Sequence, residues 1–221
     1  MSIPPLKGPA KGVVFDLDGT LVDSLATTFD AFNHGIVLCG VRPHTADEII
    51  AHFGPGEAEI FARIVGKDRA QEAYAACRRY LDEHLEDVPL HDGVLPLLDA
   101  LAENRIPTSI VTGRSWNTTE VILRHHGLLD RFVTVVANDH VPHPKPAPDG
   151  IRLALQRMSL RPEETVYVGD SAVDIQASRS AGSGSVAALW DGLASREALA
   201  IHDPHHWANH PSELLQLVRL R

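Results

Sequence analysis

The sequence predicts an α/β protein, a doubly wound parallel sheet with an all-helical segment inserted after its first strand. Short, β-branched and almost wholly apolar segments recur along the chain, which is typical of strands covered on both faces. From about residue 91 these segments alternate with helical stretches, as in a parallel sheet. Between the first such segment and residue 89, no convincing strand interrupts a run of good helix formers.

The first half of the chain is expected to contain one strand and several helices. The strand covers 12–16 and leads into the sequence Asp-Leu-Asp-Gly-Thr. A helix is expected over 24–34, with Ser24 at its N-cap position. Helix-start residues at 45–50 and a stretch rich in Ala, Glu, Arg and Leu over 68–85 predict further helices.

These helices indicate a second, smaller domain. We expect a helical cap domain at 24–89 and an α/β core formed by 1–23 and 90–221. The segment Gly54-Pro55-Gly56 lacks the third glycine and the strand–helix context of a dinucleotide-binding loop, so we expect it to join two cap helices.

The second half of the chain alternates regularly between the two types of element. Helices are expected over 94–103, 117–125, 149–158 and 173–181, and strands over 108–111, 132–137, 165–168 and 185–188. In a doubly wound sheet the active site lies at the carboxyl ends of the strands, so residues that follow the strands are the candidates for chemistry.

Composition excludes several classes of protein. The 221 residues include 20 Lys and Arg against 29 Asp and Glu, a net charge of −9, which argues against nucleic-acid binding. Cys39 and Cys77 lack CxxC spacing, so we expect neither a disulfide framework nor a cysteine zinc site, and a reducing cytoplasm. We find no secretory signal, and the apolar runs fall short of the ~20 residues that span a bilayer. We expect a soluble monomer or homodimer with no membrane partner.

Two carboxylates follow the first strand. Asp16 and Asp18, spaced i and i+2, can face the same cavity, and Gly19 allows a turn where a Cβ would obstruct the chain. Such close like charges repel unless a cation lies between them or one is protonated. One carboxylate can then serve as a nucleophile and the other as a proton shuttle.

Polar residues also follow three later strands. Thr112 and Gly113 end the strand at 108–111, and Gly113 leaves backbone N–H groups accessible. Lys145 lies between two prolines, which hold it on a stiff loop. If a helix opens at Asp170, the i, i+4 spacing places Asp170 and Asp174 on one face. With the first pair they supply the hard oxygen ligands that Mg²⁺ prefers.

These motifs, DxDGT, then Thr, Lys and GDxxxD in this order and spacing, closely resemble those of the haloacid dehalogenase superfamily. The resemblance covers essentially the whole chain and is to the phosphatase branch with a small helical cap, typified by phosphoglycolate phosphatases. It implies that Asp16 is the nucleophile and forms an aspartyl-phosphate, and that Asp18 protonates the leaving oxygen and then activates water. It also implies that Thr112 and Lys145 bind the phosphoryl group.

The resemblance further implies a Mg²⁺ site. Its ligands would be Asp16, the backbone carbonyl of Asp18, Asp170 and, through water, Asp174. The carboxylate at Asp18 favours phosphate-ester chemistry, because relatives that cleave carbon–halogen or carbon–phosphorus bonds lack it. Thr20 favours a phosphatase over a sugar phosphomutase, in which an aliphatic residue often stands there.

The expected function is a Mg²⁺-dependent phosphatase for a small phosphorylated metabolite, with phosphoglycolate-like compounds as the leading candidates. Two alternatives stay open: a sugar phosphomutase of the same superfamily, and a non-catalytic phospholigand-binding or regulatory protein. The pair Gly113-Arg114 departs from the Asn or Ser common after the threonine, so Arg114 either binds a substrate anion or points to solvent. In the family, cap segments face the site, which makes His52, Phe53 and Glu57 candidates for substrate contact.

Overall fold

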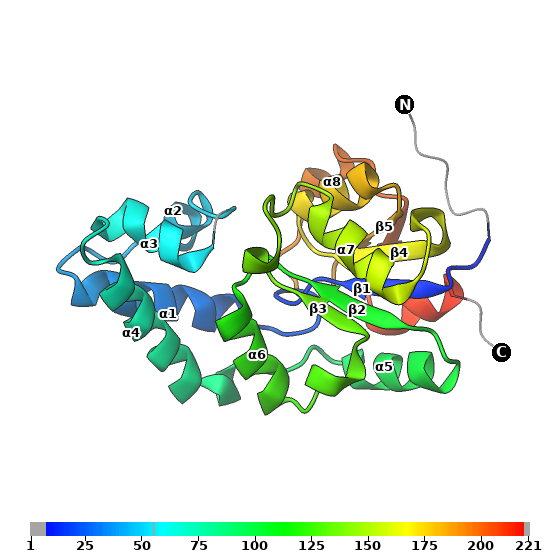
Figure 1. The fold of residues 1–221 in the computed structure, drawn as a ribbon, viewed down its shortest axis with the longest axis horizontal. Coiled ribbons are helices and arrows are strands. Elements are labelled where there is room, and N and C mark those ends of the chain that lie inside the picture. Colours follow the sequence, from blue (N-terminus) through cyan, green and yellow to red (C-terminus); the bar gives the residue numbers. More distant parts are fainter. Residues whose placement is uncertain (1–7, 55, 219–221) are drawn as a thin grey trace.

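A six-stranded parallel sheet forms the centre of the computed structural model, which describes residues 8–54 and 56–218 (Figure 1). The ends of the predicted core at 1–7 and 219–221, and Pro55 in the predicted cap, lie outside the described residues. The strand order is β3-β2-β1-β4-β5-β6, as expected for a doubly wound fold. The strands are β1 (Gly12–Phe15), β2 (Thr108–Val111), β3 (Thr134–Val136), β4 (Thr165–Gly169), β5 (Gly184–Ala188) and β6 (His206–Ala208).

The register of the central strands brings their carboxyl ends level. Phe15, the last residue of β1, pairs with Ile110 of β2 on one side and with Val168 of β4 on the other. The residues that follow these three strands therefore leave the sheet at the same edge. This alignment places the predicted motifs together.

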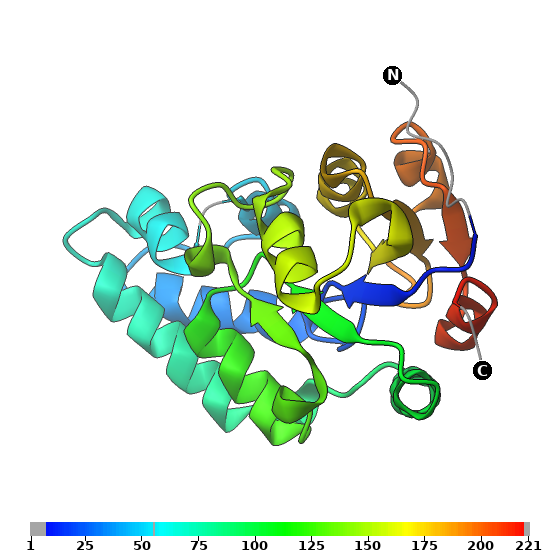
Figure 2. The same ribbon diagram turned by 45° about the vertical axis from the view of Figure 1, so that its right-hand side comes forward.

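Helices cover both faces of the sheet, as Figure 2 shows. Val13 and Phe15 of β1 pack in one apolar cluster with helices α5 (Val94–Glu103) and α6 (Trp116–His125), while Val14 between them packs in another. The second cluster includes residues of α7 (Asp149–Met158) and α8 (Ala172–Ala181). Successive side chains of a strand point to opposite faces, and both faces are covered, which explains why most positions in these strands are apolar.

Four helices form a separate bundle beside the sheet (Figure 1). This α1–α4 bundle consists of α1 (Leu25–Leu38), α2 (Ala46–Ile50), α3 (Glu57–Val65) and α4 (Ala70–Glu83). It has its own apolar cluster, in which the rings of Phe32 and Phe61 stack with centroids 4.9 Å apart. At Gly35, α1 approaches α4 so closely that an added Cβ would lie 2.4 Å from the carbonyl oxygen of Ala73.

Short elements account for most differences from the prediction. The helix α9 (Arg196–Ala200) and the strand β6 have five and three residues, too few for a periodic signal, and the sequence did not indicate them. Strand β3 is shorter than the expected 132–137: it begins at Thr134, after a 3₁₀ turn at Leu129–Arg131, and ends at Val136. Within residues 8–54 and 56–218, we see no helix with the length and apolar character needed to cross a membrane.

Candidate active site

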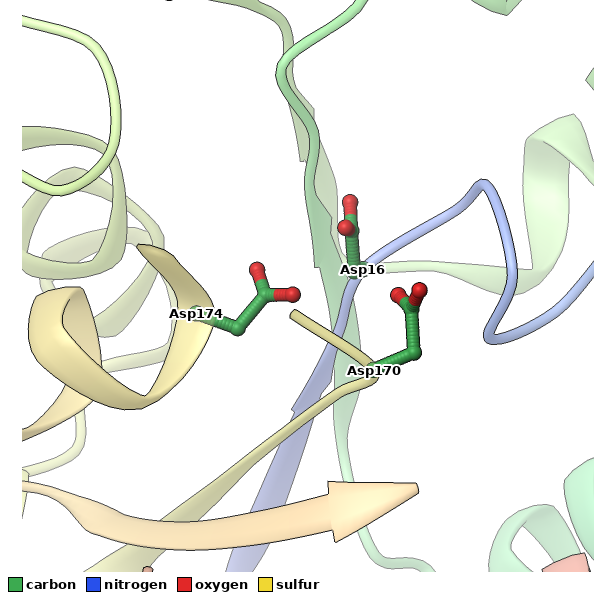
Figure 3. A group of neighbouring side chains, drawn as sticks. All are labelled: Asp16, Asp170 and Asp174. Carbon is green, nitrogen blue, oxygen red and sulfur yellow. The ribbon is translucent and has the colours of Figure 1, made fainter. Parts of the chain in front are cut away.

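Three carboxylates from two neighbouring strand ends meet in one group, shown in Figure 3. Asp16 follows β1, Asp170 follows β4, and Asp174 lies in the first turn of α8. One oxygen of each carboxylate lies within 4.8 Å of an oxygen of the other two. Three carboxylate oxygens at this separation could hold a hard divalent cation, with water completing its coordination.

The start of α8 explains how Asp174 reaches this group. The helix does not open at Asp170: Ser171 is its N-cap and Ala172 its first residue. Asp174 Oδ2 accepts hydrogen bonds from the backbone N–H of Ser171 (3.0 Å) and from its hydroxyl (2.5 Å), and the first of these is the bond that the N3 side chain accepts in a capping box. Asp170 thus lies in the loop before the helix, and Asp174 turns back toward it.

Two glycines make room for these carboxylates. Gly19 has a φ of +71°, and a Cβ there would lie 2.5 Å from Oδ2 of Asp170. A Cβ at Gly169 would lie 2.4 Å from Cγ of Asp174. Only glycine fits either position without displacing a carboxylate, so the expected role of Gly19 is confirmed.

Lys145 is the cation of the carboxylate group. Its Nζ lies 2.8 Å from Oδ2 of Asp16 and 2.6 Å from Oδ1 of Asp174, and its side chain is 6% exposed. Its Nζ also donates to the hydroxyl of Tyr167 (3.1 Å), which in turn donates to the carbonyl of Val111 (2.8 Å). Sequence reasoning missed Tyr167; the available signal was a single phenol in an otherwise aliphatic strand.

The electrostatics of this group favour an added cation. Burial, followed by repulsion from Asp174, raises the pKa of Asp16 to about 7 despite the opposing effect of Lys145. Burial and the charges of Asp174 and Asp16 raise the pKa of Asp170 well above its usual value. Burial lowers the pKa of Lys145, but its two carboxylate partners outweigh that effect and raise it. Three carboxylates around one ammonium therefore leave an excess of negative charge.

The side chain of Asp18 lies outside the carboxylate group and faces Arg114. Arg114 Nε donates to its Oδ2 (3.1 Å) and Nη2 to its Oδ1 (2.5 Å), while the hydroxyl of Ser24 also donates to Oδ1. Burial raises the pKa of Asp18, but Arg114 and Ser24 together outweigh burial and lower it. Ser24 occupies the N-cap position of α1, yet its hydroxyl makes no capping bond, because it binds Asp18.

Arg114 is buried, so the alternative of a solvent-directed side chain is wrong. The residue is 8% exposed, and besides Asp18 it binds the hydroxyl of Thr28 in α1 at 2.7 Å. An arginine is rarely buried without an acidic partner, and here the planar guanidinium matches the carboxylate of Asp18. Its expected contact with a substrate anion stays a prediction.

Thr112 and Gly113 form the loop that leaves β2. The hydroxyl of Thr112 accepts a hydrogen bond from the backbone N–H of Arg114 at 3.1 Å, which curls the loop. A Cβ added at Gly113 would meet no atom within 4 Å, so this backbone borders open space. We refer to Thr112–Arg114 below as the β2 loop.

The three candidates from the α1–α4 bundle lie in different environments. Glu57 is buried and binds residues at the start of α6. His52 is half-buried, and Phe53 is 43% exposed with its ring centroid 6.2 Å from that of Phe32. Substrate contact by any of the three stays a prediction.

Comparison with known proteins gives a consistent result. A family model described as haloacid dehalogenase-like hydrolase matches residues 13–188. The pyrophosphatase PpaX of Bacillus velezensis is 29% identical over 210 residues, which cover 95% of this chain and 96% of that protein.

Two solved structures share the fold. A predicted phosphoglycolate phosphatase from Haemophilus somnus has a TM-score of 0.82 at 23% identity, covering 94% of this chain and 97% of its own. A haloacid dehalogenase-like hydrolase from Streptococcus pneumoniae has a TM-score of 0.76 at 28% identity, with coverage of 94% and 97%. The resemblance drawn from the motifs, the fold class and the prediction of a hydrolase are confirmed. The chain belongs to the haloacid dehalogenase-like hydrolase family.

Proposed function

We propose that this protein is a Mg²⁺-dependent phosphatase that hydrolyses a small phosphomonoester through an aspartyl-phosphate on Asp16. The observation that carries this proposal is the position of Asp16: it follows the central strand, pairs with Lys145 at 2.8 Å, and belongs to the group of three carboxylates. Phosphoryl transfer needs an aligned nucleophile and positive charge around the phosphoryl oxygens, and this arrangement provides both.

In the first step, a carboxylate oxygen of Asp16 attacks phosphorus and the bond to the leaving oxygen breaks. Lys145 and Thr112, with the backbone N–H of Gly113, bind the phosphoryl oxygens as negative charge develops on them. Asp18 gives its proton to the leaving oxygen, so that an alcohol departs.

In the second step, water attacks the aspartyl-phosphate. Asp18, now a carboxylate, removes a proton from that water, and the P–O bond to Asp16 breaks to release inorganic phosphate. The pairing with Arg114 lowers the pKa of Asp18 and so favours this base role. The acid role in the first step needs the protonated form, so it requires Asp18 to leave Arg114 when substrate binds.

The donors present fit a magnesium ion. Asp16 and Asp170 would bind it directly, together with the backbone carbonyl of Asp18. Both oxygens of Asp174 already accept bonds from Lys145 and Ser171, which supports a contact through water. When bound, Mg²⁺ supplies the positive charge that lets a carboxylate approach a phosphate dianion.

We also propose that 24–89 acts as a cap domain on a core of 1–23 and 90–221. The separate apolar cluster of the α1–α4 bundle supports this division. By closing over the carboxylate group, the cap would exclude bulk water during phosphoryl transfer.

Two substrates head the list of candidates. A phosphoglycolate-like compound remains the first, and the fold shared with the Haemophilus somnus protein is in keeping with it. Inorganic pyrophosphate is the second, because the Bacillus velezensis relative that is similar over 95% of this chain is a pyrophosphatase. Pyrophosphate is a phosphoanhydride and not a phosphomonoester, so in that case the group that leaves in the first step is phosphate in place of an alcohol.

The test is phosphate release from a panel of phosphorylated metabolites that includes 2-phosphoglycolate, sugar phosphates and pyrophosphate, with Mg²⁺ and with EDTA. We expect Mg²⁺-dependent release that is abolished in Asp16→Asn. Isomerisation of a sugar phosphate without phosphate release would instead identify a phosphomutase. Failure to convert any compound would favour a non-catalytic phospholigand-binding protein.

We further propose a cytoplasmic location and a monomeric or homodimeric state. The free thiols of Cys39 and Cys77 support the location, since extracellular proteins tend to pair their cysteines. Size-exclusion chromatography with light scattering tests the oligomeric state.

A further inference from the structure

Glu57, the first residue of α3, has a buried carboxylate that contacts the start of α6. Glu57 is 7% exposed, although glutamates are almost never this buried unless they are paired. Its Oε2 accepts a hydrogen bond from the backbone N–H of Ser115 at 3.0 Å, and its Oε1 accepts one from the hydroxyl of Thr118 at 2.8 Å. Both donors lie at the start of α6, directly after the β2 loop.

Glu57 caps α6 from another helix. Ser115 is the N-cap residue of α6, but its hydroxyl makes no capping bond and instead contacts the hydroxyls of Tyr74 (2.8 Å) and Thr118 (3.2 Å). In a capping box, a glutamate three residues into the same helix accepts from the N-cap N–H. Here that carboxylate comes from 58 positions earlier in the chain, and the helix dipole favours its charge.

A second contact involves Arg114, the last residue of the β2 loop. The side chain of Asn138, which follows β3, donates to the carbonyl of Gly54 in the α1–α4 bundle at 3.1 Å. The backbone N–H of Asn138 donates to the carbonyl of Arg114 at 2.9 Å. The end of the β2 loop is therefore bonded to Asn138 and adjoins Ser115, and each of these residues also contacts the segment 54–57.

We propose that Glu57 is a positioning residue of the reaction: it caps α6 from the α1–α4 bundle and thereby holds the β2 loop where Thr112 and Gly113 can bind the phosphoryl group. This inference rests on the proposed function. If Glu57 acts in this way, the contact between the bundle and the core and the positioning of the β2 loop occur together. Small misplacements of a binding group cost as much as ~10²-fold in rate, so a group that touches no substrate can still control turnover.

The kinetic test compares Glu57→Ala and Glu57→Gln with Glu59→Gln, using p-nitrophenyl phosphate. Glu59 is the matched control, because it lies on the same helix, is exposed, and pairs with Arg63 at the surface. We expect Glu57→Ala to lower kcat about tenfold or more, with KM changed less than about threefold. Glu57→Gln keeps an acceptor for the Ser115 N–H and should retain more activity, while Glu59→Gln should match the wild type.

Hydrogen exchange gives a readout that needs no turnover. We expect amides at the start of α6 to exchange faster in Glu57→Ala and in Thr118→Val, and to be unchanged in Glu59→Gln. If the wild type hydrolyses no phosphate, the proposed function fails, while the exchange data still decide whether Glu57 caps α6. If Glu57→Ala does not fold, Glu57→Gln and Thr118→Val carry the same comparison.

Three results would overturn the proposal. The first is a kcat in Glu57→Ala within about twofold of the wild type. The second is unchanged exchange at the start of α6. The third is a loss of activity that Glu59→Gln reproduces. That result would mean that negative charge on α3 matters and that the hydrogen bonds of Glu57 to the start of α6 do not.

Discussion

Replacing Arg114 with methionine should expose the energetic role of the buried ion pair with Asp18. The side chains of Arg114 and Asp18 are 7% and 20% exposed, and methionine fills much of the volume without the charge. Breaking a buried pair from one side costs about 3–5 kcal/mol, because the remaining charge is left uncompensated. We expect the lower end, about 3 kcal/mol, because Asp18 keeps some solvent and its bond from Ser24.

The pH dependence of that loss follows from the pKa of Asp18. In the wild type the pKa of Asp18 is lowered in the folded state. The stabilisation from its pair with Arg114 is therefore complete when the pH is above the usual pKa of an aspartate, and it is lost only as the pH falls through the lowered pKa. In Arg114→Met, burial acts without the arginine and raises the pKa. The folded variant then binds a proton more readily than the unfolded chain, so the difference in stability between the variant and the wild type should shrink as the pH falls.

Urea unfolding of four proteins measures both effects: the wild type, Arg114→Met, Asp18→Asn and the double variant. The double variant leaves no buried charge unpaired, so it should recover most of the lost free energy of unfolding. A loss below about 1 kcal/mol at pH 7.5, or one that grows toward pH 5, would refute the reasoning.

Three further predictions concern the metal, the bundle and a thiol. Mg²⁺ should raise Tm, EDTA should reverse the rise, and Asp170→Asn should reduce it; a Tm insensitive to Mg²⁺ would contradict the site. Gly35→Ala should lower the free energy of unfolding by about 1–3 kcal/mol in urea melts, because the added Cβ would clash with the carbonyl oxygen of Ala73. A variant as stable as the wild type would show that α1 and α4 can move apart at no cost. Burial raises the pKa of Cys77 to about 12, so at pH 8 a disulfide reagent should modify Cys39 alone until guanidinium unfolds the protein. Two reactive thiols in the native protein would contradict the burial of Cys77.

The core of the fold was accessible from the sequence because its elements are local and periodic. The helices at 94–103 and 149–158 and the strand at 108–111 agree with the structure to the residue. Elements of three to five residues, such as β6 and α9, carry too little pattern, and pairing with β5 is what defines β6.

The proposed site also has features that the sequence predicted and contacts that it did not. The common location of Asp16, Asp170 and Asp174 followed from strand ends and motif spacing, since parallel strands bring their carboxyl ends to one edge. Lys145 was assigned to the site through the family resemblance. The partners of these residues did not follow. Tyr167 beneath Lys145 is separated from it by 22 positions, and no local rule links them.

By itself, the sequence determined the sheet and the helical insertion, and it predicted Asp16, Asp18, Asp170 and Asp174 at one edge of that sheet, because periodicity, turns and strand ends depend on neighbouring residues. Three of these carboxylates meet in the structure, while the side chain of Asp18 faces Arg114. The tertiary structure alone decided that Arg114 is buried against Asp18, that Ser24 binds Asp18 and does not cap α1, and that a carboxylate from α3 caps α6. These contacts join residues 6 to 96 positions apart in the chain, and those of Ser24 and Glu57 connect the α1–α4 bundle with the rest of the protein. A charged side chain is buried or solvated according to the partner that the packed chain brings to it, and that partner is set by packing.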